Sequence, residues 1–187
     1  MVEPTPLSAE ERRVALQLAR QAIVAALYGR ARHSVSDIPA MLREPCGAFV
    51  TVYCRDELRG CVGTIDTDSS FDEAVQRLAC AAALNDHRFS PLSLEEMGGV
   101  RIEISRLTPL RPARIAEIDV GVHGVCLDCD GSRAVFLPKV ASEHGWDRST
   151  LLTELCRKAL LPDDAWMLSA ASLFTFTAEV FDDNEFG

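Results

Sequence analysis

The sequence predicts an α+β fold in which two lobes, built from mainly antiparallel or mixed sheets with packed helices, surround a cleft. Strand-forming stretches come in pairs joined by short turns, which is typical of β-hairpins. Helical stretches separate these hairpins from later single strands, unlike the regular alternation of a parallel sheet. The order hairpin, helix, strand occurs twice, at about 46–108 and 122–182, without a residue-level repeat. A cleft between two such halves is a natural place for a ligand.

Composition and charge predict a soluble single-domain protein that does not bind nucleic acid. The 187 residues fit a single domain, 1–187, and 48% hydrophobic with 25% charged residues is ordinary for a soluble chain. A net charge of −9 without a clustered basic surface excludes nucleic acid as a predicted partner. No uncharged apolar run is long enough to span a membrane, and no signal-peptide pattern is present. Seven cysteines, an odd number, favour reduced thiols and a cytoplasmic location.

The first predicted element is a helix over about 8–29. Ser8 and Glu11 form a capping box, in which each side chain accepts a hydrogen bond from the other residue's backbone N–H. Apolar residues then recur with a helical period up to Gly29, a typical helix end. The polar stretch from Arg30 to Pro45 is predicted to be a loop.

The first hairpin–helix–strand unit follows. Cys46–Cys54 is rich in Val, Phe, Thr and Tyr and predicts a strand, and Leu58–Thr64 returns as its hairpin partner. A second capping box at Ser70–Glu73 begins a helix that runs to about Leu84. Val100–Thr108 alternates between apolar and polar residues, which predicts a strand with one buried face.

The second unit repeats this order. Val122–Leu127 and Ala134–Leu137 predict a hairpin, whose second strand ends at Pro138. Asp147 is a candidate cap for a following helix. Ser172–Phe181 is predicted to close the domain as one strand.

The stretch Leu58–Gly63 is the candidate site. Side chains alternate along a strand, so Arg59 and Cys61 are expected to point the same way. A guanidinium near a thiol favours the reactive thiolate, which makes Cys61 a candidate nucleophile and Arg59 a candidate substrate contact. Gly60 and Gly63 allow a ligand or another backbone to approach closely. The alternative is that Cys61 is a small buried hydrophobic residue.

Four more residues complete the candidate site. His123, between two glycines, is a candidate general base, although a turn histidine with a satisfied ring fits the pattern equally. Glu103 is a candidate to orient an imidazole or pair with an arginine, and the alternative is a structural ion pair. His87 and Arg88 are candidate substrate contacts that could equally cap the preceding helix.

Motifs for metals and cofactors are weak. Cys126 and Cys129 have the spacing of a metal knuckle or a dithiol, but no second ligand pair follows and no helix begins there, so two incidental thiols are predicted. Metal binding by Cys61, His123 and Glu103 together stays an alternative. The absence of phosphate-cradling and dinucleotide-binding glycine motifs predicts no cofactor.

Several motifs, in one order, resemble the AMMECR family, named after a human chromosomal region of Alport syndrome, midface hypoplasia and elliptocytosis. They are Leu58–Gly63, Asp86–Leu92, Ile102–Ser105, Gly121–Gly124, Phe136–Pro138, Gly145–Trp146 and Cys156–Ala159. The chain most resembles the prokaryotic members, those of the AmmeMemoRadiSam system. The resemblance implies a two-lobed α+β fold with Leu58–Gly63 at a cleft, and a genomic association with a radical S-adenosylmethionine protein and a Memo-like protein. Two residues depart from the family pattern: His87 replaces a common proline, and Leu160 replaces a common glycine.

Two functions follow from these patterns. In the first, Cys61 is the centre of a site that binds or transforms a small molecule in a pathway with the two associated proteins. In the second, the chain is a non-catalytic interaction module, and the glycine-containing strand accepts an extended partner segment by backbone pairing.

Overall fold

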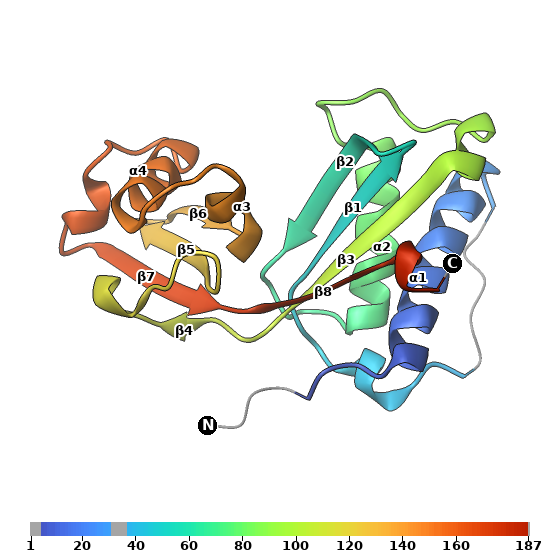
Figure 1. Cartoon of the computed structure of the whole chain (residues 1–187), viewed down its shortest axis with the longest axis horizontal. Helices are drawn as coiled ribbons and strands as arrows, with labels where there is room; N and C mark the ends of the chain where they lie inside the picture. The colour runs from blue at the N-terminus through green and yellow to red at the C-terminus, as the bar shows by residue number, and fades with distance from the viewer. Residues whose placement is uncertain (1–4, 31–36, 187) are drawn as a thin grey trace. The chain divides into compact units, whose positions relative to one another are not determined.

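The computed structural model describes residues 5–30 and 37–186, so part of the predicted loop, 31–36, lies outside the described residues. The chain forms two compact units, one made of Met1–Leu107 with Glu179–Gly187 and the other of Thr108–Ala178. Each unit contains a four-stranded antiparallel sheet and helices, which confirms the predicted α+β class (Figure 1). In the described part of the chain, no helix is both long and apolar enough to cross a membrane.

The first helix, α1 (Ala9–Leu27), begins as predicted. The Ser8 hydroxyl accepts the Glu11 N–H at 3.3 Å, and the Glu11 carboxylate accepts the Ser8 N–H at 2.7 Å, so the capping box is confirmed. Gly29 follows the helix with a φ of +64°, a conformation that glycine adopts without strain. The predicted loop beyond it is wrong at one place, because Ala40–Arg43 form a turn of 3₁₀ helix.

The sheet of the first unit has the strand order β2-β1-β3-β8. Its strands are β1 (Ala48–Cys54), β2 (Glu57–Thr64), β3 (Val100–Leu107) and β8 (Ala178–Asp182). The predicted hairpin of β1 and β2 is confirmed. Helix α2 (Phe71–Leu84) packs on β1 and β2, and α1 packs beside it on β3 (Figure 1). Inward side chains of the sheet, such as Val50, Val52, Ile102 and Ile104, are fully buried beneath these helices.

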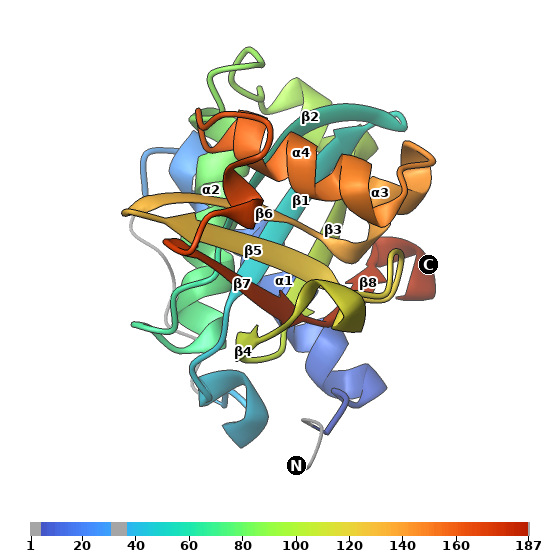
Figure 2. The same cartoon turned by 90° about the vertical axis from the view of Figure 1, so that its left-hand side faces the viewer.

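The second unit has the strand order β4-β7-β5-β6, with α3 and α4 on the β5–β6 hairpin (Figure 2). Its elements are β4 (Arg111–Pro112), β5 (Gly124–Cys129), β6 (Ser132–Phe136), α3 (Pro138–Glu143), α4 (Arg148–Lys158) and β7 (Ala171–Phe176). Asp147 caps α4 as predicted, since its carboxylate accepts the Thr150 N–H at 2.8 Å. Pro138 does more than end a strand, because it is the first residue of α3, where a missing N–H costs nothing.

The predicted final strand, Ser172–Phe181, is wrong as a single element. It consists of β7 and β8, which belong to the sheets of different units and are separated by Thr177. The Thr177 N–H donates to the Thr108 hydroxyl at 2.9 Å instead of continuing a strand. Phe176 and Phe181 are both buried, an odd number of residues apart, which an unbroken strand with one buried face does not allow.

The repeated order of elements is confirmed at the level of topology. In each unit a hairpin is followed by helix and then by a strand that pairs with the first strand of the hairpin, giving β2-β1-β3 and β6-β5-β7. A fourth strand, β8 in one sheet and β4 in the other, then pairs beside β3 and β7, respectively. The same sheet is therefore built twice along the chain.

Candidate functional site

Strand β2 presents Cys61 on the sheet face opposite to the helices. Gly60 faces α2 so closely that a Cβ atom there would lie 1.9 Å from the Ala82 carbonyl oxygen. Side chains alternate along a strand, so Cys61 points to the other face. Thr51 of β1 lies opposite Cys61, and Glu103 of β3 lies opposite Thr51. Three predicted strands therefore place a thiol, a hydroxyl and a carboxylate in one cross-strand row.

The Cys61 sulfur is hydrogen-bonded, and the residue is partly exposed. The Thr51 hydroxyl donates to it at 3.3 Å, and Thr51 is itself buried. A donor aimed at sulfur stabilises the negative charge of a thiolate. Cys80 on α2 is also partly exposed, whereas the other five cysteines are buried. Cys61 is thus one of two thiols within reach of solvent.

Asp86, in the loop after α2, holds the backbone of Cys61. Its Oδ2 accepts the Cys61 N–H at 2.9 Å. The carboxylate also accepts Nε and Nη2 of Arg88 at 2.9 and 2.7 Å, and the Arg88 backbone N–H at 3.2 Å. The hydrogen bonds from the Arg88 side chain, helped by the two backbone N–H groups, hold the pKa of Asp86 well below its usual range. They do so although the side chain is only 4% exposed.

Arg88 completes the contact with the strand. Its Nη2 donates to the Cys61 carbonyl oxygen at 3.2 Å while it also bonds Asp86. The hydrogen bond to Asp86 raises the pKa of Arg88 against the opposing effect of burial, and the charge of Asp86 adds to the increase. Both backbone polar groups of Cys61 are therefore bonded to one carboxylate–guanidinium pair. This pair occupies the outer edge of β2, where a further strand would otherwise add.

Asp86 was not among the predicted site residues. The sequence held one usable signal, because an Asp directly after a helix often bonds the backbone N–H two residues on, as Asp86 does with Arg88. What the sequence could not show is that this loop reaches the edge of β2 at Cys61.

Arg59 is bonded to other partners than Cys61, and its role as a substrate contact stays a prediction. The pairing of β1 and β2 shifts between Val52 and Tyr53, which leaves Arg59 as the extra residue of a β-bulge. Its guanidinium forms an ion pair with Glu96 and donates to the Ser90 carbonyl at 3.1 Å. Arg88, not Arg59, is the guanidinium bonded to Cys61.

The two predicted glycine contacts have packing reasons. Gly60 is required by the close approach of α2. A Cβ at Gly63 would lie 2.1 Å from the Phe49 ring, so this ring occupies the space that a side chain would need. His87, the other predicted contact in this unit, is exposed in the turn between Asp86 and Arg88.

His123 belongs to the second unit. The ring Nδ1 of His123 accepts the Asp119 backbone N–H at 3.0 Å, and the backbone N–H of His123 donates to the Asp119 carbonyl at 2.9 Å. The hydrogen bond at Nδ1 assigns the ring proton of the neutral form to Nε2. This is the geometry of the predicted turn histidine, and a role as a base stays a prediction.

Cys126 and Cys129 are free and buried on β5, where burial raises the pKa of the Cys126 thiol. Across residues 5–30 and 37–186, no group of three or more His, Cys, Asp or Glu side chains is arranged to hold a metal.

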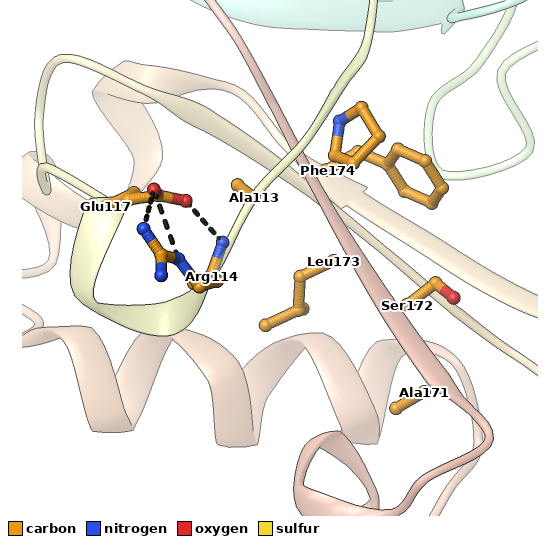
Figure 3. A pocket seen from close by; sticks show the side chains of 8 residues that line it. Ala113, Arg114, Glu117, Ala171, Ser172, Leu173 and Phe174 are labelled. Atoms are coloured by element: carbon orange, nitrogen blue, oxygen red, sulfur yellow. Dashed lines mark hydrogen bonds and ion pairs between the residues drawn. The ribbon is translucent and has the colours of Figure 1, made fainter.

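A shallow groove of about 570 Å³ lies in the second unit, along β7. The paired side chains of Arg114 and Glu117 stand on one side of it, and Leu173 and Phe174 come from the strand (Figure 3). The residues that line the groove include no cysteine or histidine, and its polar side chains are those of Arg114, Glu117 and Ser172.

Comparison with known proteins decides the family. The AMMECR1 family matches residues 16–181. The chain belongs to the AMMECR1 family. It is 34% identical to a protein of Methanothermobacter thermautotrophicus, with 94% of this chain and 96% of that one covered. It is also 34% identical to Protein MJ0810 of Methanocaldococcus jannaschii, at 96% and 93% coverage. The crystal structure of an uncharacterized protein from Pyrococcus horikoshii, PH0010, matches with a TM-score of 0.87 and 34% identity, covering 94% and 93% of the chains.

Proposed function

We propose that Cys61 is a reactive thiol that binds or transforms a small molecule in a cytoplasmic pathway. The observation that carries this proposal is the hydrogen bond from the hydroxyl of the buried Thr51 to the sulfur of the partly exposed Cys61. The thiolate is the nucleophilic form of cysteine, and a donor fixed on the sulfur stabilises that form without having to reorganise.

The contacts around Cys61 support a chemical role for this residue more than a role in packing alone. Asp86 and Arg88 bond the N–H and the carbonyl of Cys61, so the strand that carries the sulfur is held in place. The Arg88 charge favours a neighbouring negative charge. A site fixed in this way holds its nucleophile ready, which is what covalent catalysis or covalent capture requires.

The same contacts weigh against the interaction-module alternative. Adding a strand to β2 needs free backbone groups along its outer edge. At Cys61 those groups are bonded to the Asp86 carboxylate and the Arg88 guanidinium. A partner segment would have to displace a buried carboxylate from its hydrogen bonds.

Replacing Thr51 by Val tests the role of the hydrogen bond. Valine keeps the shape and the strand preference of threonine but removes the donor. A hydrogen bond to a charged group contributes about 1.5 kcal/mol, which corresponds to roughly tenfold in rate. A less stabilised thiolate is intrinsically more nucleophilic by about threefold, so alkylation of Cys61 by iodoacetamide should slow by about threefold.

The matched control is Thr64→Val on β2, the strand that carries Cys61, since Thr64 bonds Asp66 and not the thiol. Peptide mass spectrometry after a short pulse of reagent gives the rate at each cysteine. Equal rates at Cys61 in both variants and the wild type would remove the observation on which the proposal rests.

The family resemblance supports a radical S-adenosylmethionine protein and a Memo-like protein as partners in the same pathway. We expect each to be retained by the immobilised wild-type chain and also by Cys61→Ser, because the thiol is assigned to chemistry rather than to docking. Loss of both partners in Cys61→Ser, with the fold intact by circular dichroism, would contradict the assignment of the thiol to chemistry rather than to docking.

A further inference from the structure

We propose that Arg88 is the anion-recognition residue of the Cys61 site, so that the molecule acting there is small and carries a carboxylate or phosphate group. The inference rests on the proposed function, since it names the class of molecule for the same thiol.

A guanidinium has more donors than Asp86 uses. In Arg88, Nε and Nη2 bond the Asp86 carboxylate, and Nη2 also bonds the Cys61 carbonyl. Within the described residues, Nη1 makes no hydrogen bond, and the side chain is 51% exposed. Arginine presents its donors in a planar fork that matches carboxylate and phosphate oxygens. One side of this fork therefore stays available to an anion from solvent.

The position of the guanidinium is fixed relative to the nucleophile. Asp86 is buried and bonds both the Arg88 side chain and the Cys61 N–H, so one carboxylate links the two residues. Arg88 also bonds the carbonyl of Cys61 itself. An anion bound at Nη1 would thus sit next to the residue that carries the thiol, which places the rest of a small molecule within reach of the sulfur.

The other guanidinium near this strand is not suited to the task. The Arg59 side chain is only 19% exposed and is engaged by Glu96 and by the Ser90 carbonyl. Its charge is neutralised by a carboxylate inside the loop. Of these two arginines, only Arg88 combines a fixed position, a hydrogen bond to Cys61 and an exposed donor.

Two alkylating reagents that differ in charge test the inference. Iodoacetate carries a carboxylate and iodoacetamide does not, yet with both the thiolate forms a C–S bond while iodide leaves with the electrons of the C–I bond. The quantity to measure is the iodoacetate-to-iodoacetamide rate ratio at Cys61, divided by the same ratio for N-acetylcysteine. We expect about fivefold in the wild type, the effect of one unit charge attracting another at contact distance in water.

In Arg88→Gln the normalised ratio should fall to about one, while Arg13→Gln, which removes an equal charge from α1, should leave it unchanged. A second measurement needs no variant. Inorganic phosphate should slow the alkylation of the wild type by iodoacetate, because the two anions compete for Arg88, and should leave the rate with iodoacetamide unchanged.

The outcomes separate this inference from the proposed function. Fast reaction of Cys61 with iodoacetamide, but a normalised ratio near one and no effect of phosphate on the rate with iodoacetate, would overturn the anion site and leave the reactive thiol standing. Slow reaction with both reagents would overturn both. A ratio that falls equally in Arg88→Gln and Arg13→Gln would show that the reagent responds to the overall charge of the protein, and would also overturn the assignment of Arg88.

Discussion

Replacing Asp86 by Asn should destabilise the first unit, because it removes the charge that joins Arg88 to the edge of β2. The carboxylate accepts four hydrogen bonds, three from Arg88 and one from the Cys61 N–H. Asparagine keeps one acceptor oxygen and turns an NH₂ group towards donors. The two groups have nearly the same size, so the change tests charge and hydrogen bonding rather than packing.

The magnitude follows from the exposure of the two partners. A hydrogen bond to a charged group contributes about 1.5–3 kcal/mol when buried. The Arg88 side chain is half exposed, so its ion pair is screened by water and contributes at most about 1 kcal/mol. We therefore expect a loss of about 2–3 kcal/mol in the free energy of unfolding. For a chain of this size that corresponds to a fall in Tm of about 4–12 °C.

The loss should depend on pH with a definite sign. The pKa of Asp86 is lower in the folded protein than in the unfolded chain, so the unfolded chain takes up the proton first as the pH falls. The stabilisation is complete above about pH 5 and decreases below about pH 4, the ordinary range of an aspartate. The difference between wild type and Asp86→Asn should therefore be full at neutral pH and become smaller under acid conditions.

Urea unfolding followed by circular dichroism, at neutral pH and at about pH 3, measures both effects. Asp68→Asn is the matched control, since the same chemical change is made at an exposed position. If Asp86→Asn unfolds at the same urea concentration as Asp68→Asn, or if its deficit is as large in acid as at neutral pH, the structural role given to Asp86 is refuted.

Two further substitutions test the packing and the backbone. Gly60→Ala should cost about 2–3 kcal/mol or more, because its Cβ would meet the backbone oxygen of Ala82, whereas Gly98→Ala has nothing within 4 Å and should be nearly neutral in the same melts. An equal stability of the two alanine variants would contradict the close contact of β2 with α2. Leu160→Gly should raise the stability of the second unit by about 0.5–1 kcal/mol, because Leu160 is 94% exposed and has a φ of +59°, which costs a residue with a side chain about 1–2 kcal/mol. A decrease in Tm for Leu160→Gly would show that the leucine makes a stabilising contact.

Local chemistry explains how much of the fold could be predicted. The capping residues Ser8 and Asp147 act through atoms three residues away, and both are confirmed. The hairpins also follow from local alternation and turn residues. The division of the last strand at Thr177 does not, because it depends on a hydrogen bond to Thr108, far away in the sequence.

The candidate site shows the same division. The alternation of side chains along a strand correctly places Gly60 and Cys61 on opposite faces of β2. A bulge changes the position of Arg59, and no residue type in this stretch predicts that bulge. Asp86 and Arg88 bond each other locally, yet their contact with Cys61 joins a loop to a strand some 25 residues apart. The departure at Leu160, in contrast, was visible in the sequence, and the structure gives it the left-handed conformation that glycine would adopt.

The central claim is that Cys61 is chemically more reactive than an ordinary thiol of equal access. Cys80 provides the internal comparison, because it is also partly exposed in the same unit. A short pulse of iodoacetamide on the native wild-type chain at neutral pH, with each cysteine peptide quantified by mass spectrometry, gives both rates in one sample. We expect Cys61 to be alkylated about threefold faster than Cys80, the net effect of the Thr51 hydrogen bond on the stability and the intrinsic nucleophilicity of the thiolate. Equal rates, or a faster reaction at Cys80, would contradict the assignment of Cys61 as the reactive centre.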